Sequence, residues 1–409
     1  MQIQSYKDEH TNLSYQLIVV GTIWALICLK IIFVDRPIGG YIEYFIYVAA
    51  IANVIMNGKI ILYGVKYSIE KCFGLLAIFQ IYGLLQNLSL FAVKNIIATL
   101  VIMCFLLTTI ELRAIPFHFF RWMYLMTIGV IFYQTISHYN LGNTISGCVV
   151  FLTCAFALTE LIRVRVDNSK RKSAFRSIRA LLINAAGIGC AVYIAWTSGA
   201  RTALFTMLII VALFIFFSIT KPKRKTYIKL FWFVVGVAVI VTVFYINIHE
   251  FSLYSKFNIY SVMYFDKNID SSRPYLWKTS LESLKWWQWI IGAGTGKLPS
   301  VARYAISSFH NSYIQLLMQT GIMGLGCLVM ALKALWKHIV RVDDDIIIRF
   351  SIAMFCGILA YNCFECTLLQ NKTFLGITQW MCISIACIYS NYKSDFDSNT
   401  DKGRISLNG

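Results

Sequence analysis

The stretch RTALFTMLIIVALFIFFSITKPKRK, residues 201–225, contains the pattern that decides the fold. Residues 202–220 are predominantly apolar and carry no charged side chain, and the cationic cluster KPKRK follows them directly. A run of ~20 apolar residues is the length that an α-helix needs to cross the ~30 Å hydrocarbon core of a bilayer. The stretch therefore predicts a membrane-spanning helix with a cationic segment at one end.

The same pattern recurs along the whole chain of 409 residues, of which 58% are hydrophobic and 14% charged, with a mean hydropathy of +0.66. Soluble domains contain ~45–50% apolar and ~25% charged residues, so the composition excludes a soluble protein. The apolar runs are long rather than alternating, which excludes a transmembrane barrel. We expect an all-α, polytopic helical bundle.

We predict about twelve membrane spans from apolar runs of the required length. Their expected limits are 14–34, 42–57, 72–91, 95–112, 118–137, 141–162, 180–197, 202–220, 228–248, 311–335, 348–366 and 372–391. This division places nine helices in residues 1–248, one long loop at 249–310 between helices 9 and 10, three helices at 311–391, and a disordered tail at 392–409.

The basic residues predict the orientation of the chain. The net charge is +18, and most of the 37 lysines and arginines fall in segments that lie inside if the N-terminus is inside. The clusters at 163–179 and 221–225 are typical of loops retained in the cytoplasm. Because the basic residues do not form one continuous face, we expect no nucleic-acid binding. Both termini are expected in the cytoplasm, and the 249–310 loop on the outer side.

The glycine-rich sequence GAGTGK, residues 292–297, lies in that loop and fails as a nucleotide-binding loop. A phosphate-binding loop needs a glycine where Ile291 stands and a serine or threonine where Leu298 stands. No ATP is expected on the outer side either. The glycines instead predict a tight turn and close helix packing.

The sequence SSRPYLWKTSLESLKWWQW, residues 271–289, repeats large apolar side chains at helical spacing. These residues are Trp277, Leu281, Leu284 and Trp287. We expect one amphipathic helix here, lying on the outer leaflet with its tryptophans at headgroup level. An ordinary interfacial belt and a role in shaping a substrate site remain open.

Three arginines near the outer membrane edge are candidate phosphate ligands. Arg201 opens the eighth predicted span, Arg273 opens the amphipathic segment, and Arg303 precedes His310 by seven residues. A charged residue at this depth marks function by default, with a snorkelling anchor as the alternative. The planar guanidinium group binds phosphate oxygens bidentately and stays charged.

His310 is a candidate general base because it directly precedes an apolar helix. Asn311 or Ser312 is a good N-cap for that helix, and the positive end of a helix dipole favours neutral imidazole. The remaining histidines have no metal-ligand spacing, so we expect no metal and no cofactor.

The blocks SGARTALF, SSRPYLWKTSLE and IIGAGTGK…FHNSYIQLLMQTGIMGL together resemble the O-antigen ligase and polymerase superfamily over residues 195–330. These proteins are polytopic glycosyltransferases of the membrane class C architecture. The resemblance implies a glycan donor linked to undecaprenyl pyrophosphate, used without metal or nucleotide on the periplasmic face of the bacterial inner membrane. It implies that Arg201 and Arg273 hold the pyrophosphate and that His310 is the base, while Arg303 has no counterpart in the family pattern. We expect Arg303 in the pyrophosphate site beside them and Asn311 as the helix cap near the base.

The acceptor divides this superfamily, and no motif in the chain identifies it. We favour a polymerase for O-antigen or capsule, whose acceptor is a new lipid-linked repeat unit and whose partners include a chain-length regulator protein. A ligase acting on lipid A-core and a protein O-oligosaccharyltransferase remain alternatives. A transporter of lipid-linked glycans fits less well, because the halves of the chain lack visible self-similarity.

Overall fold

The computed structural model of this chain describes residues 18–33, 36–56, 68–110, 117–136, 142–168, 174–297 and 308–405. Within these ranges the regular structure is entirely helical. The all-α prediction is confirmed for this part of the chain.

The helices follow the predicted spans along the chain. A helix over Ile18–Ile32 comes first. It is followed by α2 (Pro37–Met56), α4 (Ser68–Gln86), α5 (Leu90–Ile110), α6 (Phe117–Ile136), α7 (Gly142–Asn168), α8 (Ala174–Thr197), α9 (Arg201–Thr220), α10 (Arg224–Ile246), η1 (Ile248–Glu250), α11 (Tyr254–Phe265), α12 (Arg273–Glu282), α13 (Trp286–Ile291), α14 (Ser312–Ile339), α15 (Ile346–Tyr361) and α16 (Thr373–Ile405). Among the described residues, 7 helices are long and apolar enough to cross a membrane, and the count of twelve stays a prediction.

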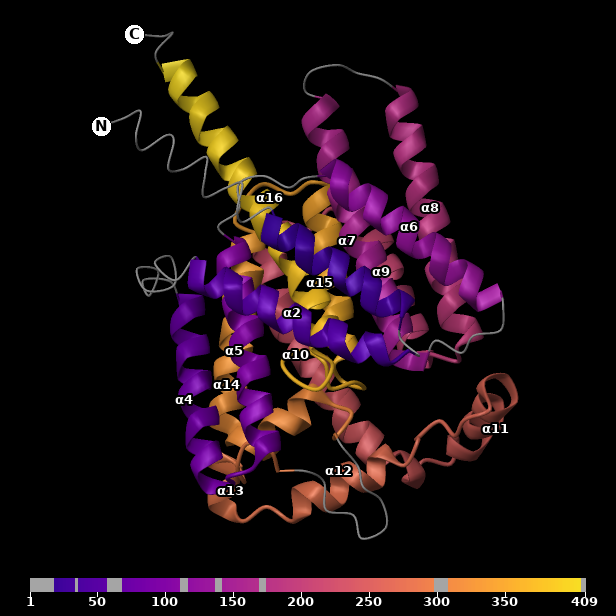
Figure 1. Ribbon diagram of the computed structural model, residues 1–409, viewed down its shortest axis with the longest axis vertical. Coiled ribbons are helices and arrows are strands. Elements are labelled where there is room, and N and C mark those ends of the chain that lie inside the picture. The colour runs from indigo at the N-terminus through magenta and orange to yellow at the C-terminus, as the bar shows by residue number, and fades with distance from the viewer. Residues whose placement is uncertain are drawn as a thin grey trace.

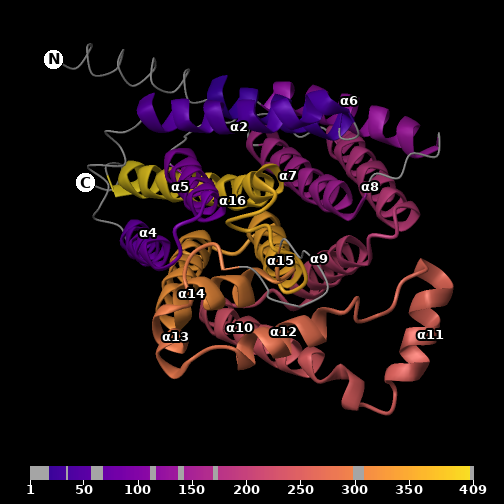
Figure 2. The same cartoon turned by 60° about the horizontal axis from the view of Figure 1, so that its bottom comes forward.

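The centre of the bundle is formed by α16 and α7, whose apolar stretches are buried almost throughout. Helix α5 packs on α16, α9 packs on α15, and α4 runs along α14. Helix α10 exposes most of its length on the outside of the bundle, where a membrane protein meets lipid (Figure 2). The buried share of the helices is thus highest at the centre, in α16 and α7, and low in α10 on the outside.

The helices between α10 and α14 gather at one end of the bundle. Figure 1 shows α11, α12 and α13 at this end, and the C-terminal end of α16 at the opposite end. The expected loop at 249–310 begins with η1 after α10 and is followed by α14. We call this end of the molecule the α12 end.

The predicted amphipathic helix at 271–289 is wrong in two respects. The chain forms two helices, α12 and α13, because the helix stops at Ser283–Lys285. Trp277 is fully buried against protein instead of lying on a leaflet. Its indole Nε1 donates to the carbonyl of Phe309 at 2.6 Å, which satisfies the polar end of the ring inside the protein.

Two predicted boundaries also differ from the structure. The span expected at 348–366 ends at Tyr361, and residues 362–372 form a non-helical segment, which we call the polar segment. Its Asn362 and Thr367 side chains bind backbone, each other and Gln379 of α16, an alternative to continued helix. At the other end, α16 continues to Ile405, so the described part of the expected disordered tail is helical.

The GAGTGK sequence is a turn between closely packed helices, as predicted. Gly292, Gly294 and Gly296 all have positive φ, a region that glycine adopts without strain. The amide of Ala293 donates to the carbonyl of Met318 on α14 at 2.7 Å, and Thr295 N donates to Gly83 O on α4 at 3.0 Å. The turn therefore joins the end of α13 to α4 and α14 by hydrogen bonds.

Gly292 and Gly321 face each other across this contact and should tolerate no side chain. A Cβ on Gly292 would lie 2.2 Å from the Gln319 carbonyl oxygen, and one on Gly321 would lie 2.2 Å from that of Ile290. Because φ is also positive at both residues, we expect Gly292→Ala and Gly321→Ala each to lower the free energy of unfolding by roughly 2 kcal/mol or more.

Thermal unfolding of the detergent-solubilised protein, monitored by size-exclusion chromatography, measures this loss of stability. Gly326→Ala on the same helix α14 is the matched control, because nothing lies within 4 Å of its Cβ position. Equal melting temperatures for Gly292→Ala and Gly326→Ala would contradict the packing role of the turn.

Candidate active site

The polar segment packs against the beginning of α14 at the α12 end of the bundle. The amide of Ser312 donates to the Asn362 carbonyl at 2.9 Å, and its hydroxyl donates to Asn362 Oδ1 at 2.8 Å. The same hydroxyl accepts from the amide of Thr367 at 3.2 Å. These bonds replace the helical pattern that ends at Tyr361 and fix the segment in place.

Arg273, the first residue of α12, binds this segment through both ends of its guanidinium fork. Nη1 donates to the carbonyl of Phe364 at 2.5 Å, and Nη2 lies 3.1 Å from Glu365 Oε1. Both side chains are only 14% exposed, so the ion pair is largely shielded from solvent. The turn before Arg273 contains two residues with positive φ, Ser271 and Ser272, which reverse the chain and direct α12 toward the polar segment.

Glu365 is a candidate site residue that sequence reasoning missed. Burial alone would raise its pKa, but the contact with His310 and the charge of Arg273 outweigh burial, so the pKa of Glu365 lies below its ordinary value. A lone carboxylate in the apolar sequence YNCFECTLL was the available signal, because charged residues at membrane depth are usually functional.

His310 lies on the other side of the same carboxylate. Its Nδ1 is 3.6 Å from Glu365 Oε2, an electrostatic contact longer than a normal hydrogen bond, and the ring is 44% exposed. The backbone of His310 has φ +50°, which is uncommon for a non-glycine residue and recurs at functional sites. The helix end considered from sequence is therefore not the only charged feature near this ring, because the Glu365 carboxylate lies beside it.

Asn311 holds His310 between α14 and the polar segment. It is fully buried, and its Oδ1 accepts from the amides of Tyr313 and Ile314, both at 2.9 Å, as an N-cap does. Its Nδ2 donates to the carbonyl of Cys363 at 2.8 Å. Since Trp277 binds the carbonyl just before the histidine, His310 is anchored on both sides.

Arg201 stands at the N-terminus of α9 and binds the segment that leads into α12. Nη1 donates to Ser261 Oγ at 2.5 Å and to the Asn268 carbonyl at 2.9 Å. Nη2 donates to Ser271 Oγ at 2.8 Å. All of these acceptors are neutral, so the positive charge of Arg201 is not cancelled by its hydrogen-bond partners.

Tyr245, near the end of α10, contacts both the segment that leads into α12 and the polar segment. Its hydroxyl donates to the Asp270 carbonyl at 2.9 Å, and its ring packs against Phe364 of the polar segment at 5.3 Å. Ser271, which accepts from Arg201, lies two residues before Arg273 in the turn that leads into α12. The structure thus brings Arg201, Arg273 and His310 to one end of the bundle, whereas Arg303 falls outside the described residues.

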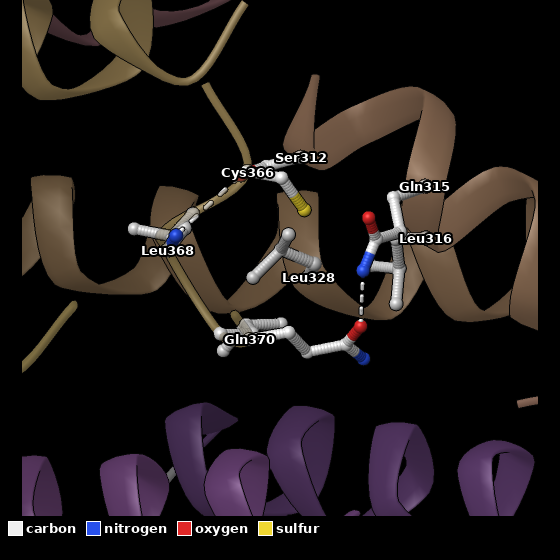
Figure 3. Close-up of a pocket in the computed structure, with 8 residues that line it drawn as sticks. Ser312, Gln315, Leu316, Leu328, Cys366, Leu368 and Gln370 are labelled. Carbon is white, nitrogen blue, oxygen red and sulfur yellow. Dashed lines mark hydrogen bonds between the residues drawn. The ribbon is translucent and has the colours of Figure 1, made fainter. Parts of the chain in front are cut away.

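A ladder of buried amide side chains extends inward from the site. The amide of Phe309 donates to Gln315 Oε1 at 3.4 Å, Gln315 Nε2 donates to Gln370 Oε1 at 2.6 Å, and Gln370 Nε2 donates to Gln319 Oε1 at 2.8 Å. Figure 3 shows the central bond of this ladder beside a cavity of about 10 Å³, about the smallest that can hold one water molecule. The ladder joins the polar segment to α14 one turn after another.

The described residues contain neither a cluster of potential metal ligands nor a disulfide. No group of three histidine, cysteine, aspartate or glutamate side chains that could hold a metal occurs there. Cys363 and Cys366 are buried free thiols, and burial raises the pKa of Cys363 to about 12. A thiol with so high a pKa is typical of packing.

The charge of Glu365 should stabilise the fold in a pH-dependent way. Because its folded-state pKa is lowered, its contribution is present above the ordinary value of ~4.3 and disappears as the pH falls through the folded value. We expect Glu365→Gln to lower the free energy of unfolding by roughly 1–3 kcal/mol, which lies between the values for exposed and for buried ion pairs. The deficit should be constant from pH 8 to ~5 and shrink below ~4.

Melting temperatures of wild type and variant across this range measure the effect. Glu250→Gln is the matched control, since Glu250 is 69% exposed and lies 3.8 Å from Lys278. A deficit that persists unchanged at the lowest pH would show that the charge of Glu365 is not the stabilising feature.

One family model matches a part of the chain that contains several residues of this site. Residues 186–329 match the family model described as O-antigen ligase, a range that includes Arg201, Arg273, His310 and Asn311. A search of curated proteins finds no match. Members of the matched family are glycosyltransferase-like enzymes of the membrane that act on a lipid-linked glycan. The match confirms the resemblance read from the sequence: residues 186–329 carry the domain of the O-antigen ligase and polymerase superfamily.

Proposed function

We propose that this chain is a polysaccharide polymerase that transfers a growing O-antigen or capsule glycan from undecaprenyl pyrophosphate to a new lipid-linked repeat unit. One observation carries the proposal: one oxygen of Glu365 binds Arg273 and the other lies 3.6 Å from His310, while Arg201 binds Ser271, two residues before Arg273. Such a site offers cations for a pyrophosphate and an oriented imidazole for a hydroxyl.

The proposed reaction needs only these side chains. The acceptor hydroxyl attacks the anomeric carbon of the donor sugar, the bond from that carbon to the pyrophosphate oxygen breaks, and the new glycosidic bond forms. In this scheme His310 accepts the hydroxyl proton on Nε2, because Glu365 lies beside its Nδ1. Arg201 and Arg273 stabilise the negative charge that grows on the departing pyrophosphate.

Glu365 is a positioning residue in this scheme. It holds the guanidinium of Arg273 and orients the imidazole, as a carboxylate does for histidine in other transfer enzymes. Arg201 would exchange its neutral acceptors, Ser261 and Ser271, for phosphate oxygens when the donor binds. Charge-assisted bonds to phosphate are stronger than bonds to hydroxyls, so this exchange is favourable.

The proposal includes a location and partners. We place the α12 end on the periplasmic side of the bacterial inner membrane, both termini in the cytoplasm, and Arg303 beside the site. The clusters of basic residues at 163–179 and 221–225 support this orientation. An enzyme on that side has no ATP and relies on the energy of its lipid pyrophosphate donor. A chain-length regulator protein is a further proposed partner.

A ligase that transfers the glycan to lipid A-core is the second candidate, because the matched family model is described as O-antigen ligase. The arginines, His310 and Glu365 would act on the donor in the same way in both enzymes. Only the acceptor differs.

Loss of either arginine should remove transfer while the protein still inserts. We expect Arg201→Ala and Arg273→Ala to lower the transfer rate by roughly 10²–10³-fold, the usual cost of a lost transition-state donor. Arg273→Lys should recover only part of the rate, because lysine has no planar fork. Transfer of labelled glycan in proteoliposomes measures the rate.

Lys278→Ala is the control for these variants, since Lys278 is a cation on the same helix α12 with a half-exposed side chain. Polymer of normal amount and length from Arg201→Ala or Arg273→Ala would contradict the proposed pyrophosphate site.

Glycan gels from a deletion strain should identify the acceptor. We expect core with a single repeat unit when the gene is deleted, and a full ladder when wild type is restored, but no ladder with His310→Ala. Bare core with accumulated lipid-linked polymer would instead identify a ligase. Unchanged glycan length and linkage would indicate a transporter, and a full ladder with His310→Ala would exclude the histidine as base.

A further inference from the structure

Helix α11 has its polar side turned inward. Asn258 Oδ1 accepts from the amide of Ile269 at 2.8 Å, and Ser261 Oγ donates to the Lys267 carbonyl at 2.7 Å while accepting from Arg201. Tyr254, one turn earlier, is partly buried, and its ring lies 4.4 Å from that of His249. These positions repeat every three or four residues and form one face of the helix.

The opposite side of α11 is apolar and aromatic. Its large side chains have exposed fractions between 42% and 66%. They are Phe257, Ile259, Tyr260, Val262, Met263 and Tyr264. The single charged residue of the helix is Lys256, whose long side chain can keep its ammonium in water while its stem lies on apolar surface.

This arrangement reverses the pattern of a helix on a water-soluble surface. Such a helix packs its apolar face on the protein and turns its polar face to water. Exposed apolar patches of this kind mark contact with another protein or with a membrane. An apolar environment would therefore suit the outer side of α11 better than water does.

The depth of α11 is fixed by two contacts with membrane-spanning helices. Ser261 binds Arg201, the first residue of the candidate span α9. Phe251, just before α11, packs on Phe244 near the end of α10 with ring centroids 4.3 Å apart. The lipid-facing side of α10 thus continues into α11 at the level where the spans leave the hydrocarbon.

Figures 1 and 2 both show α11 at the edge of the molecule, beyond the bundle and on the same end as α12. Among the described residues, α11 packs on neighbouring η1 and binds α9 through Ser261 and Arg201. A lateral position next to lipid-facing helices is where a bilayer would meet it.

We propose that α11 is an interfacial helix whose apolar face inserts into the lipid leaflet on the α12 side, at the boundary between headgroups and acyl chains. Tyrosines at the edge of the patch suit this boundary, because the ring is apolar and the hydroxyl polar. Lipid contact would hold Ser261, and through it Arg201, at headgroup level. The proposal does not depend on the reaction that the site catalyses.

Spin labels test which medium surrounds α11. We would replace Met263 with cysteine, label it in the full-length protein, and reconstitute it in nanodiscs of phosphatidylethanolamine and phosphatidylglycerol. Glu282→Cys, an exposed position on α12, is the matched control. Wild type labelled in parallel gives the background from the twelve native cysteines.

The label at 263 should be more accessible to oxygen, which concentrates in lipid, than to a water-soluble nickel complex, and the order should reverse at 282. The same order at 263 as at 282 would show that water covers α11 and would overturn the proposal. Exclusion of both reagents at 263 would also overturn it, since a protein partner or second copy would then cover the face. Ile259→Cys, one turn away, repeats the measurement if Met263→Cys fails to fold.

Discussion

The requirement that buried polar groups find partners governs the site end of this molecule. The polar segment at 362–372 interrupts the helical bundle, and its backbone would be costly there without hydrogen bonds. Ser312 and Asn311 bind its carbonyls from the start of α14, and Arg273 binds it from α12. The same bonds that make the segment possible also fix Glu365 between a cation and an imidazole.

The arrangement of the site follows from how three separate parts of the chain meet. Arg273 follows a turn with positive φ, and His310 itself has positive φ and precedes the N-cap Asn311. Glu365 lies just after the end of α15. Conformations of this kind cost free energy and persist only where packing supports them. Trp277, buried and bound to the Phe309 carbonyl, provides that support from the small core beneath the site.

The helix expected at the membrane surface and the helix that exposes an apolar face are two different helices. Tryptophans at helical spacing favoured residues 271–289 as the surface helix, but α12 uses that apolar face to bury a tertiary contact. Helix α11 presents its apolar face outward because its polar side binds Arg201 and the following turn. An apolar stripe gives the same periodicity whether it faces lipid or a protein core.

The sequence by itself determined the membrane class, the all-helical architecture, the superfamily and the failure of GAGTGK as a nucleotide loop, because length, composition and short motifs are local properties of the chain. It also predicted that the helix after His310 has a good cap. Only the tertiary structure joined Arg273 and His310 to Glu365, since the partners lie 92 and 55 residues apart and no periodicity links them. Tertiary packing likewise decided that the span ends at Tyr361 and that Trp277 faces protein, because the free energy of both choices depends on neighbours distant in sequence.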